Sequence, residues 1–144
     1  LCDNTVLNVI LIHHASICKS LGIDVDFDIR QHSVDFISAH DITAIFDNLL
    51  TNAEEAAKNT SEKYIKLSAT QQGETGVLIT VINSCNSAPD MDDDGNIKTK
   101  KEDKKHHGVG LKSVKQAVQR YHGVSRMYYS NEENRFHSVI HLTQ

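Results

Sequence analysis

Residues 48–56 read NLLTNAEEA, and they predict a helix with one polar side and one apolar side. Leu, Ala and Glu dominate the stretch, and it contains no Gly or Pro, which is typical of a helix. Asn48, Asn52 and Glu55 follow one another at helical spacing and form a polar stripe. The adjoining apolar face continues upstream and comprises Ile42, Ile45, Phe46, Leu49, Ala53 and Ala57.

The carboxamides of this stripe favour a particular kind of site. Amide oxygens are good ligands for a hard cation, and they add no charge that would repel a phosphate. An aligned pair, Asn48 and Asn52, beside an apolar face therefore suggests a magnesium–phosphate site. The alternative is an ordinary amphipathic helix in which the two Asn residues are incidental.

A second informative segment, residues 106–111, reads HHGVGL and leads directly into an amphipathic helical pattern. Gly123 lies just past the end of that pattern, as a helix stop should. We therefore predict that Gly108 and Gly110 lie at the N-terminus of a helix. Free N–H groups and missing side chains would let a phosphate approach the backbone there. The expected buried stripe of this helix is Leu111, Val114, Val118 and Tyr121.

The composition is that of one globular domain spanning residues 1–144. The formal net charge is −4 and the basic residues are scattered, so nucleic-acid binding is not suggested. No apolar run approaches the ~18 residues of a membrane span, and no signal peptide is visible. Cys2, Cys18 and Cys85 are odd in number and widely spaced, which favours reduced thiols over disulfides or a zinc site.

The other elements follow from alternating and helical patterns. Expected helices cover residues 4–20, closed by Gly22, and a segment from Ser38 or Asp41 to about Asn59. Expected strands cover residues 23–29, 63–71, 76–83, 124–130 and 135–142. This order predicts an α+β two-layer sandwich, in which a mixed β-sheet is covered on one face by three helices.

The stretch from about 84 to 107 differs from the rest of the chain. Residues 90–107 contain six acidic and five basic residues and almost nothing apolar, so they cannot stabilise themselves by burial. The stretch is either a disordered surface insertion or a mobile lid over a site. Its position between a strand and the glycine pair favours the lid.

Together these motifs resemble the Bergerat-type (GHKL) ATPase and kinase superfamily over nearly the whole chain. Residues 48–56 look like its N-box, and residues 107–111 look like its second glycine box. More narrowly, the chain resembles the ATP-binding domain of peptide-sensing histidine kinases of the accessory-gene-regulator type. That subfamily has Asn–Ser after the central strand and a Thr/Ser–Lys pair in the lid, matched here by Asn83–Ser84 and Thr99–Lys100.

The resemblance implies that ATP and Mg²⁺ are the cofactors. Asn52 would hold the metal, and Asn48 would contact a phosphate or a metal-bound water, unless it only bonds within its own helix. Glu55 would orient a metal-bound water or pair with Lys58. Asn83 would reach the adenine, unless it is merely a strand-end turn residue. The remaining nucleotide-binding residues would be Thr99, Lys100, His107, Gly108, Val109, Gly110 and Leu111.

The residue at position 48 bears on the reaction. ATP-hydrolysing relatives have a Glu one turn before the magnesium Asn, whereas Asn48 cannot accept a proton. We therefore expect transfer of the γ-phosphoryl group to a His on a separate dimerisation domain, with Asn48, Asn52 and Lys100 as catalytic residues. His13 and His14 lack the acidic residue that usually follows such an acceptor. The rivals are an anti-sigma-type serine kinase and a non-catalytic nucleotide-binding module.

The resemblance also implies a cellular setting. The phosphoacceptor-His domain would belong to the same parent protein, and a response regulator would receive the phosphate afterwards. The isolated domain would be monomeric, because dimerisation normally resides in the acceptor helices. We expect a cytoplasmic domain of a membrane-bound bacterial sensor.

Overall fold

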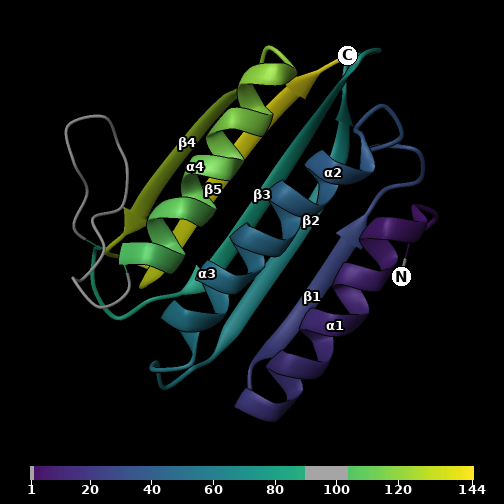
Figure 1. Ribbon diagram of the computed structural model, residues 1–144. Helices are drawn as coiled ribbons and strands as arrows, with labels where there is room; N and C mark the ends of the chain where they lie inside the picture. The colour runs from purple at the N-terminus through teal and green to yellow at the C-terminus, as the bar shows by residue number, and fades with distance from the viewer. Residues whose placement is uncertain (1, 90–103) are drawn as a thin grey trace.

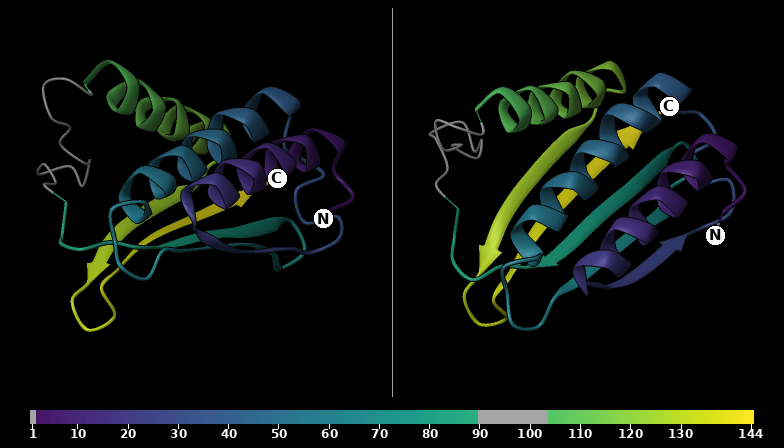
Figure 2. Two further views of the ribbon diagram at one scale, coloured as in Figure 1. Left: turned by 90° about the horizontal axis from the view of Figure 1, so that it is seen from below. Right: turned by 60° about the horizontal axis from the view of Figure 1, so that its bottom comes forward.

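The computed structural model describes residues 2–89 and 104–144, and of residues 104–109 it describes only the backbone. Five strands form one sheet in the order β1-β2-β3-β5-β4. Three helical segments, α1, α2–η1–α3 and α4, lie side by side on one face of this sheet and form the second layer (Figures 1 and 2). The predicted α+β two-layer sandwich with one covered face is therefore confirmed.

The elements occur in the predicted order. They are α1 (Thr5–Leu21), β1 (Asp24–Ile29), α2 (Ala39–Ile42), a π-helical turn η1 (Thr43–Asp47), α3 (Asn48–Ala57), β2 (Tyr64–Gln72), β3 (Gly76–Ser84), α4 (Lys104–Arg120), β4 (Val124–Ser130) and β5 (Arg135–Thr143). Strand β1 pairs in parallel with β2, and the other neighbouring strands are antiparallel, so the sheet is mixed as expected.

Helix α1 has the ends that its sequence predicts. The Asn4 side chain accepts a hydrogen bond from the Leu7 N–H at 2.9 Å and caps the first turn. Gly22 ends the helix in the left-handed conformation, with φ of 72°, where a side chain would be strained. Within the described part of the chain, no helix is long and apolar enough to cross a membrane.

The middle one of these three segments, α2–η1–α3, supplies the centre of the hydrophobic core. We call it the middle helical layer, or middle layer. Its first turn is capped by Ser38, whose Oγ accepts from the Asp41 N–H at 3.2 Å. Every residue of the predicted apolar face is buried, and alternate residues of β3 face it from the sheet. These residues are Ile42, Ile45, Phe46, Leu49, Ala53 and Ala57 on the helical layer, and Val77, Ile79 and Val81 on the strand.

A buried carboxylate ties the start of this layer to the end of α4. Asp41 accepts hydrogen bonds from the guanidinium of Arg120, from Tyr121 Oη at 2.8 Å and from Ser38 Oγ at 3.0 Å. The Arg120 hydrogen bond is the main reason why the pKa of Asp41 lies below its usual value; burial alone would raise that pKa. The contact sets α4 beside the middle layer at one end.

We predict that Asp41→Asn lowers the free energy of unfolding by about 1–3 kcal/mol at neutral pH, because it leaves Arg120 without its carboxylate. A group whose folded pKa is depressed stabilises the fold above its unfolded pKa and loses that effect as the pH falls through the folded value. The difference between wild type and variant should therefore shrink in acid, as measured by urea unfolding. The matched control is Asp26→Asn on exposed β1, and an equal loss there would contradict the prediction.

Candidate functional site

The two helices that carry the sequence motifs lie side by side and touch. A Cβ atom built on Gly110 of α4 would lie only 2.9 Å from Asn48 Oδ1. Such a distance is shorter than real Cβ contacts, so the missing side chain is what lets α4 approach α3 this closely. The two motifs are thus brought together, as the sequence predicts, at the start of α3 (Figure 1).

The π-helical turn η1 decides how Asn48 is held. The backbone N–H of Asn48 bonds to the carbonyl of Ile45, while its side-chain Nδ2 donates to the carbonyl of Ala44 at 2.6 Å. The carboxamide therefore makes the bond within its own helix that was one of the two predicted alternatives. Its Oδ1 is turned to Gly110 and remains an acceptor.

Asn52 lies one turn further along the same side of α3. Its Nδ2 is fully buried and has no hydrogen-bond partner among the described residues. An unsatisfied buried amide costs free energy, on the order of 1–3 kcal/mol, so each such group in a folded protein calls for an explanation. The other such atom among the described residues is His137 Nε2 on β5. A half-turn of the amide would place Oδ1 at the same point, where it could act as a ligand. Glu55, the third residue of the stripe, is partly buried.

Asn83 is the next-to-last residue of β3 and lies on the face that the helices cover. It is 3% exposed, and its Nδ2 donates to the carbonyl of Ser84 at 3.0 Å. Ser84 is in turn fixed to the loop after α3, because its Oγ bonds to Thr60 Oγ1 at 2.9 Å and accepts from the Tyr64 N–H at 3.0 Å. The Asn83 carboxamide is therefore held rigidly at the edge of the core with its Oδ1 as an acceptor.

A known protein family shares the sequence pattern of this chain. The family described as GHKL domain matches residues 37–142, most of the chain. The chain belongs to the GHKL domain family. None of the curated proteins matches it in sequence.

Solved structures of histidine kinases share the fold of this GHKL domain. The catalytic domain of ThkA superposes with a TM-score of 0.70 at 18% identity, and the match covers 96% of this chain and 90% of that one. The mycobacterial sensor histidine kinase MprB gives 0.66 at 14% identity, covering 96% and 93%. Full-length ShkA in complex with AMPPNP gives 0.68 at 14% identity, covering 95% of this chain and 29% of that one. At these identities the likeness concerns the fold.

The donor set of the GHKL domain fits the Mg²⁺ and nucleotide that its family implies. Asn52 presents an unsatisfied buried amide, and Asn48 and Asn83 present neutral acceptors. Neutral oxygen ligands suit a hard cation, and they add no negative charge next to phosphates.

The start of α4 differs from the prediction. The helix begins at Lys104, so Gly108 and Gly110 lie inside it instead of opening it. The residues ahead of Gly108 are Lys and His, which propagate a helix, and Gly110 fits in it because it packs on Asn48. The free N–H groups of α4 therefore belong to residues 104–107. The predicted stretch 84–107 is also shortened, because Ser84 ends β3 and Lys104 begins α4.

Several predicted site residues cannot be placed fully. Thr99 and Lys100 lie outside the described residues, as does the centre of the predicted lid. His107, Gly108 and Val109 belong to the backbone of α4, and their side chains lie outside the described part. Gly110 and Leu111 are described, and both are buried.

A polar cluster that was not predicted from the sequence lies between α1 and the middle layer. His14 of α1 is 1% exposed, and both of its ring nitrogens bond to carboxylates of the middle layer. Nδ1 lies 2.7 Å from Glu54 Oε2, and Nε2 lies 2.7 Å from Asp47 Oδ1. Cys18 donates to the same Glu54 oxygen at 3.4 Å. We call these four residues the His14 cluster.

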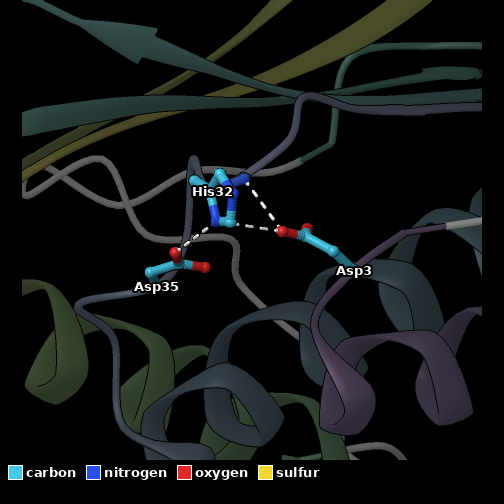
Figure 3. A group of neighbouring side chains, drawn as sticks. All are labelled: Asp3, His32 and Asp35. Carbon is cyan, nitrogen blue, oxygen red and sulfur yellow. Dashed lines mark hydrogen bonds and ion pairs between the residues drawn. The ribbon is translucent and has the colours of Figure 1, made fainter.

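A second His between two carboxylates lies at the surface, between the segment before α1 and the loop after β1 (Figure 3). His32 Nδ1 is 2.7 Å from Asp35 Oδ2 and 3.2 Å from Asp3 Oδ2. All three side chains are exposed, both carboxylates lie at the same ring nitrogen, and Asp3 also accepts from the backbone N–H of His32. No local pattern brings Asp3 near His32, so only the fold shows this group.

We predict that Gly110→Ala destabilises the domain by about 1–3 kcal/mol through overpacking, although Gly→Ala inside a helix ordinarily stabilises by roughly 0.5–1 kcal/mol. The added methyl group would displace the Asn48 carboxamide from its bond to Ala44. Thermal and urea unfolding measure the change. In an Asn48→Ala background the same substitution should become neutral or stabilising, and an equal cost in both backgrounds would refute the contact.

Proposed function

We propose that this GHKL domain is the ATP- and Mg²⁺-binding catalytic domain of a two-component sensor histidine kinase of the accessory-gene-regulator type. It would transfer the γ-phosphoryl group of ATP to a His on a separate dimerisation domain. Residues 1–144 would form the single catalytic domain, with a lid between β3 and α4. Support comes from the family match, from the fold shared with histidine kinase catalytic domains, and from ShkA, which was solved with AMPPNP.

The observation that carries the proposal is the unpartnered amide of Asn52. It is buried on the side of α3 that adjoins α4, where a polar group without a partner is costly. We assign Asn52 as the protein ligand of Mg²⁺, with Asn48 Oδ1 and Glu55 beside it to hold metal-bound water. When bound, the cation would neutralise negative charge on the phosphates.

The start of α4 is assigned to the phosphates. Its free N–H groups and the positive end of the helix dipole are features that bind anions. For the amides of Gly108, Val109 and Gly110 to reach a phosphate, the first turn of α4 must unwind, because inside a helix these groups bond to carbonyls. Thr99, Lys100, His107 and Leu111 keep their assignment to the nucleotide.

The carboxylates of the middle layer favour transfer over hydrolysis. Hydrolysis needs a base that activates water, and Asn48 cannot accept a proton. Two further carboxylates, Asp47 and Glu54, are both engaged by His14 on a different side of the helix from the Asn pair. Positioning and charge neutralisation are what phosphoryl transfer to an incoming acceptor needs.

Asn83 is assigned to the adenine. Its Nδ2 donates to the Ser84 carbonyl, so the acceptor Oδ1 is the atom that would receive the exocyclic amine. A neutral hydrogen bond contributes only about 0.5–1.5 kcal/mol, which corresponds to roughly a tenfold preference or less for ATP over GTP.

The partners follow from the same proposal. The acceptor would be a phosphoacceptor-His domain of the same parent protein, and a response regulator would act downstream. The domain would work in the cytoplasm as part of a membrane-bound bacterial sensor, and it would be monomeric when isolated. A serine kinase or a non-catalytic nucleotide-binding module would use the same fold, so phosphotransfer has to separate them.

We predict that Asn52→Ala weakens binding of Mg·ATP by at least about tenfold, because a ligand of the metal is lost. Isothermal titration calorimetry with and without Mg²⁺ measures this. With excess chelator, wild type and variant should bind ATP equally weakly. The matched control is Thr51→Ala, an exposed neighbour on the same helix, which should bind like wild type. Undiminished Mg·ATP binding by Asn52→Ala would remove the proposed metal site.

Transfer itself is tested with labelled ATP and the protein that carries both this domain and its acceptor His. We expect phosphorylation that is labile in acid and stable in alkali, as phosphohistidine is, and we expect it to be lost in Asn52→Ala. An acid-stable product would identify a serine kinase. Nucleotide binding without any transfer would leave the non-catalytic module.

A further inference from the structure

We propose that His14 is a positioning residue of the nucleotide site, because it holds the middle helical layer at two points and thereby sets the direction in which Asn48 and Asn52 project. This inference rests on the proposed function. It concerns a residue on α1 that touches neither carboxamide. The residues involved are those of the His14 cluster.

The two bonds of His14 fix the rotation of α3 about its own axis. Asp47 and Glu54 are two turns apart on one face of the helix, and both point to α1. Asn48 and Asn52 lie about 100–140° around the helix from that face, on the side of α4. Apolar contacts tolerate small rotations, whereas two 2.7 Å hydrogen bonds to a single planar ring do not. A turn of α3 would move both carboxamides together.

The bond between His14 and Asp47 also anchors the π-helical turn. Asp47 is the last residue of η1, and Asn48, which follows it, relies on η1 for its bond to the Ala44 carbonyl. A π-turn is less regular than an α-helix and is commonly found at functional sites. His14 thus restrains the irregular segment at the residue next to the carboxamide that meets Gly110.

Packing alone does not explain a His at this position. Leu7, Leu11 and Cys18 of α1 are already fully buried in the core beside it. Buried charged groups can often be replaced by apolar residues of similar volume without loss of stability. A buried His with two hydrogen bonds also fixes the orientation of the helix that it contacts, because each ring nitrogen requires its own partner.

The groups around His14 determine its response to pH. Asp47 and Glu54 face it from η1 and α3, and Cys18 and the exposed ring of His13 adjoin it on α1. Burial is the largest influence and lowers the pKa of His14, but the bonds to Glu54 and Asp47 together outweigh it and raise the pKa above its usual value. The doubly donating ring is therefore retained to higher pH than in an ordinary His, and it is lost as the pH rises through that raised value.

The experiment compares two neutral variants, each of which keeps one bond. The amide of His14→Gln reaches about as far as Nε2 and retains the bond to Asp47, whereas His14→Asn mimics Nδ1 and retains the bond to Glu54. We expect both to bind Mg·ATP about 3- to 30-fold more weakly than wild type near pH 6. We expect the ratio of variant to wild-type Kd to shrink as the pH rises. Because both proteins bind the same nucleotide, taking this ratio cancels the effect of the nucleotide's own ionisation.

A second readout needs no nucleotide. In wild type, the side-chain NH₂ signals of Asn48 and Asn52 in a ¹⁵N spectrum should follow the titration of His14. In His14→Gln and His14→Asn they should be displaced and insensitive to pH. A merely structural role would lower the melting temperature without moving these signals, and the wild-type titration decides the question if a variant fails to fold.

The exposed His32 is a matched control, because it also lies beside two carboxylates but in the loop between β1 and α2 (Figure 3). His32→Gln should change neither the Kd nor the two amide signals. If wild type binds Mg·ATP while both His14 variants match it in Kd at every pH and leave the amide signals in place, the inference is overturned and the proposed function stands. If wild type itself does not bind Mg·ATP, the proposed function fails and the inference fails with it.

Discussion

The orientation of the middle helical layer about its own axis is the constraint on which the rest of this structure depends. One side of the layer is buried on β3, a second side is gripped by His14 of α1, and a third side touches α4 at Gly110. The three contacts lie on one helix, so a rotation that improved one of them would break the others. Side chains in such a packed layer have discrete positions and do not slide continuously. The carboxamides of Asn48 and Asn52 are therefore placed by contacts on all sides.

Charge is distributed around this layer in a way that suits an anionic ligand. The carboxylates of Asp47 and Glu54 are bound by His14 on the side of α1, and Asp41 is bound by Arg120 at the end of α4. Between these pairs, the neutral amide of Asn48 faces Gly110 of α4. A carboxylate in that place would repel phosphates, at a cost that grows as water is excluded. The pairing of these acids with His14 and Arg120 is thus linked to the proposed binding of a triphosphate.

Two features of this site are departures from full packing and full hydrogen bonding. Gly110 has no side chain, which allows helix contact at Asn48, and the buried Asn52 Nδ2 has no hydrogen-bond partner within the described part of the chain. Sites that deviate from full packing and full hydrogen bonding are where function is expected, because the fold alone gains nothing from them. Both deviations occur on the facing sides of α3 and α4.

The amino-acid sequence by itself determined the elements, their order, the apolar face of the middle layer and the pairing of the Asn stripe with a glycine segment. Periodicity and end signals depend on neighbouring residues, so they can be read locally. Only the tertiary structure decided that His14 bonds to residues 33 and 40 positions away, that a π-turn precedes Asn48, and that α4 starts before its glycines. Those features arise where three helices meet on one sheet. Their geometry depends on how the helices are oriented against each other, which no local pattern encodes.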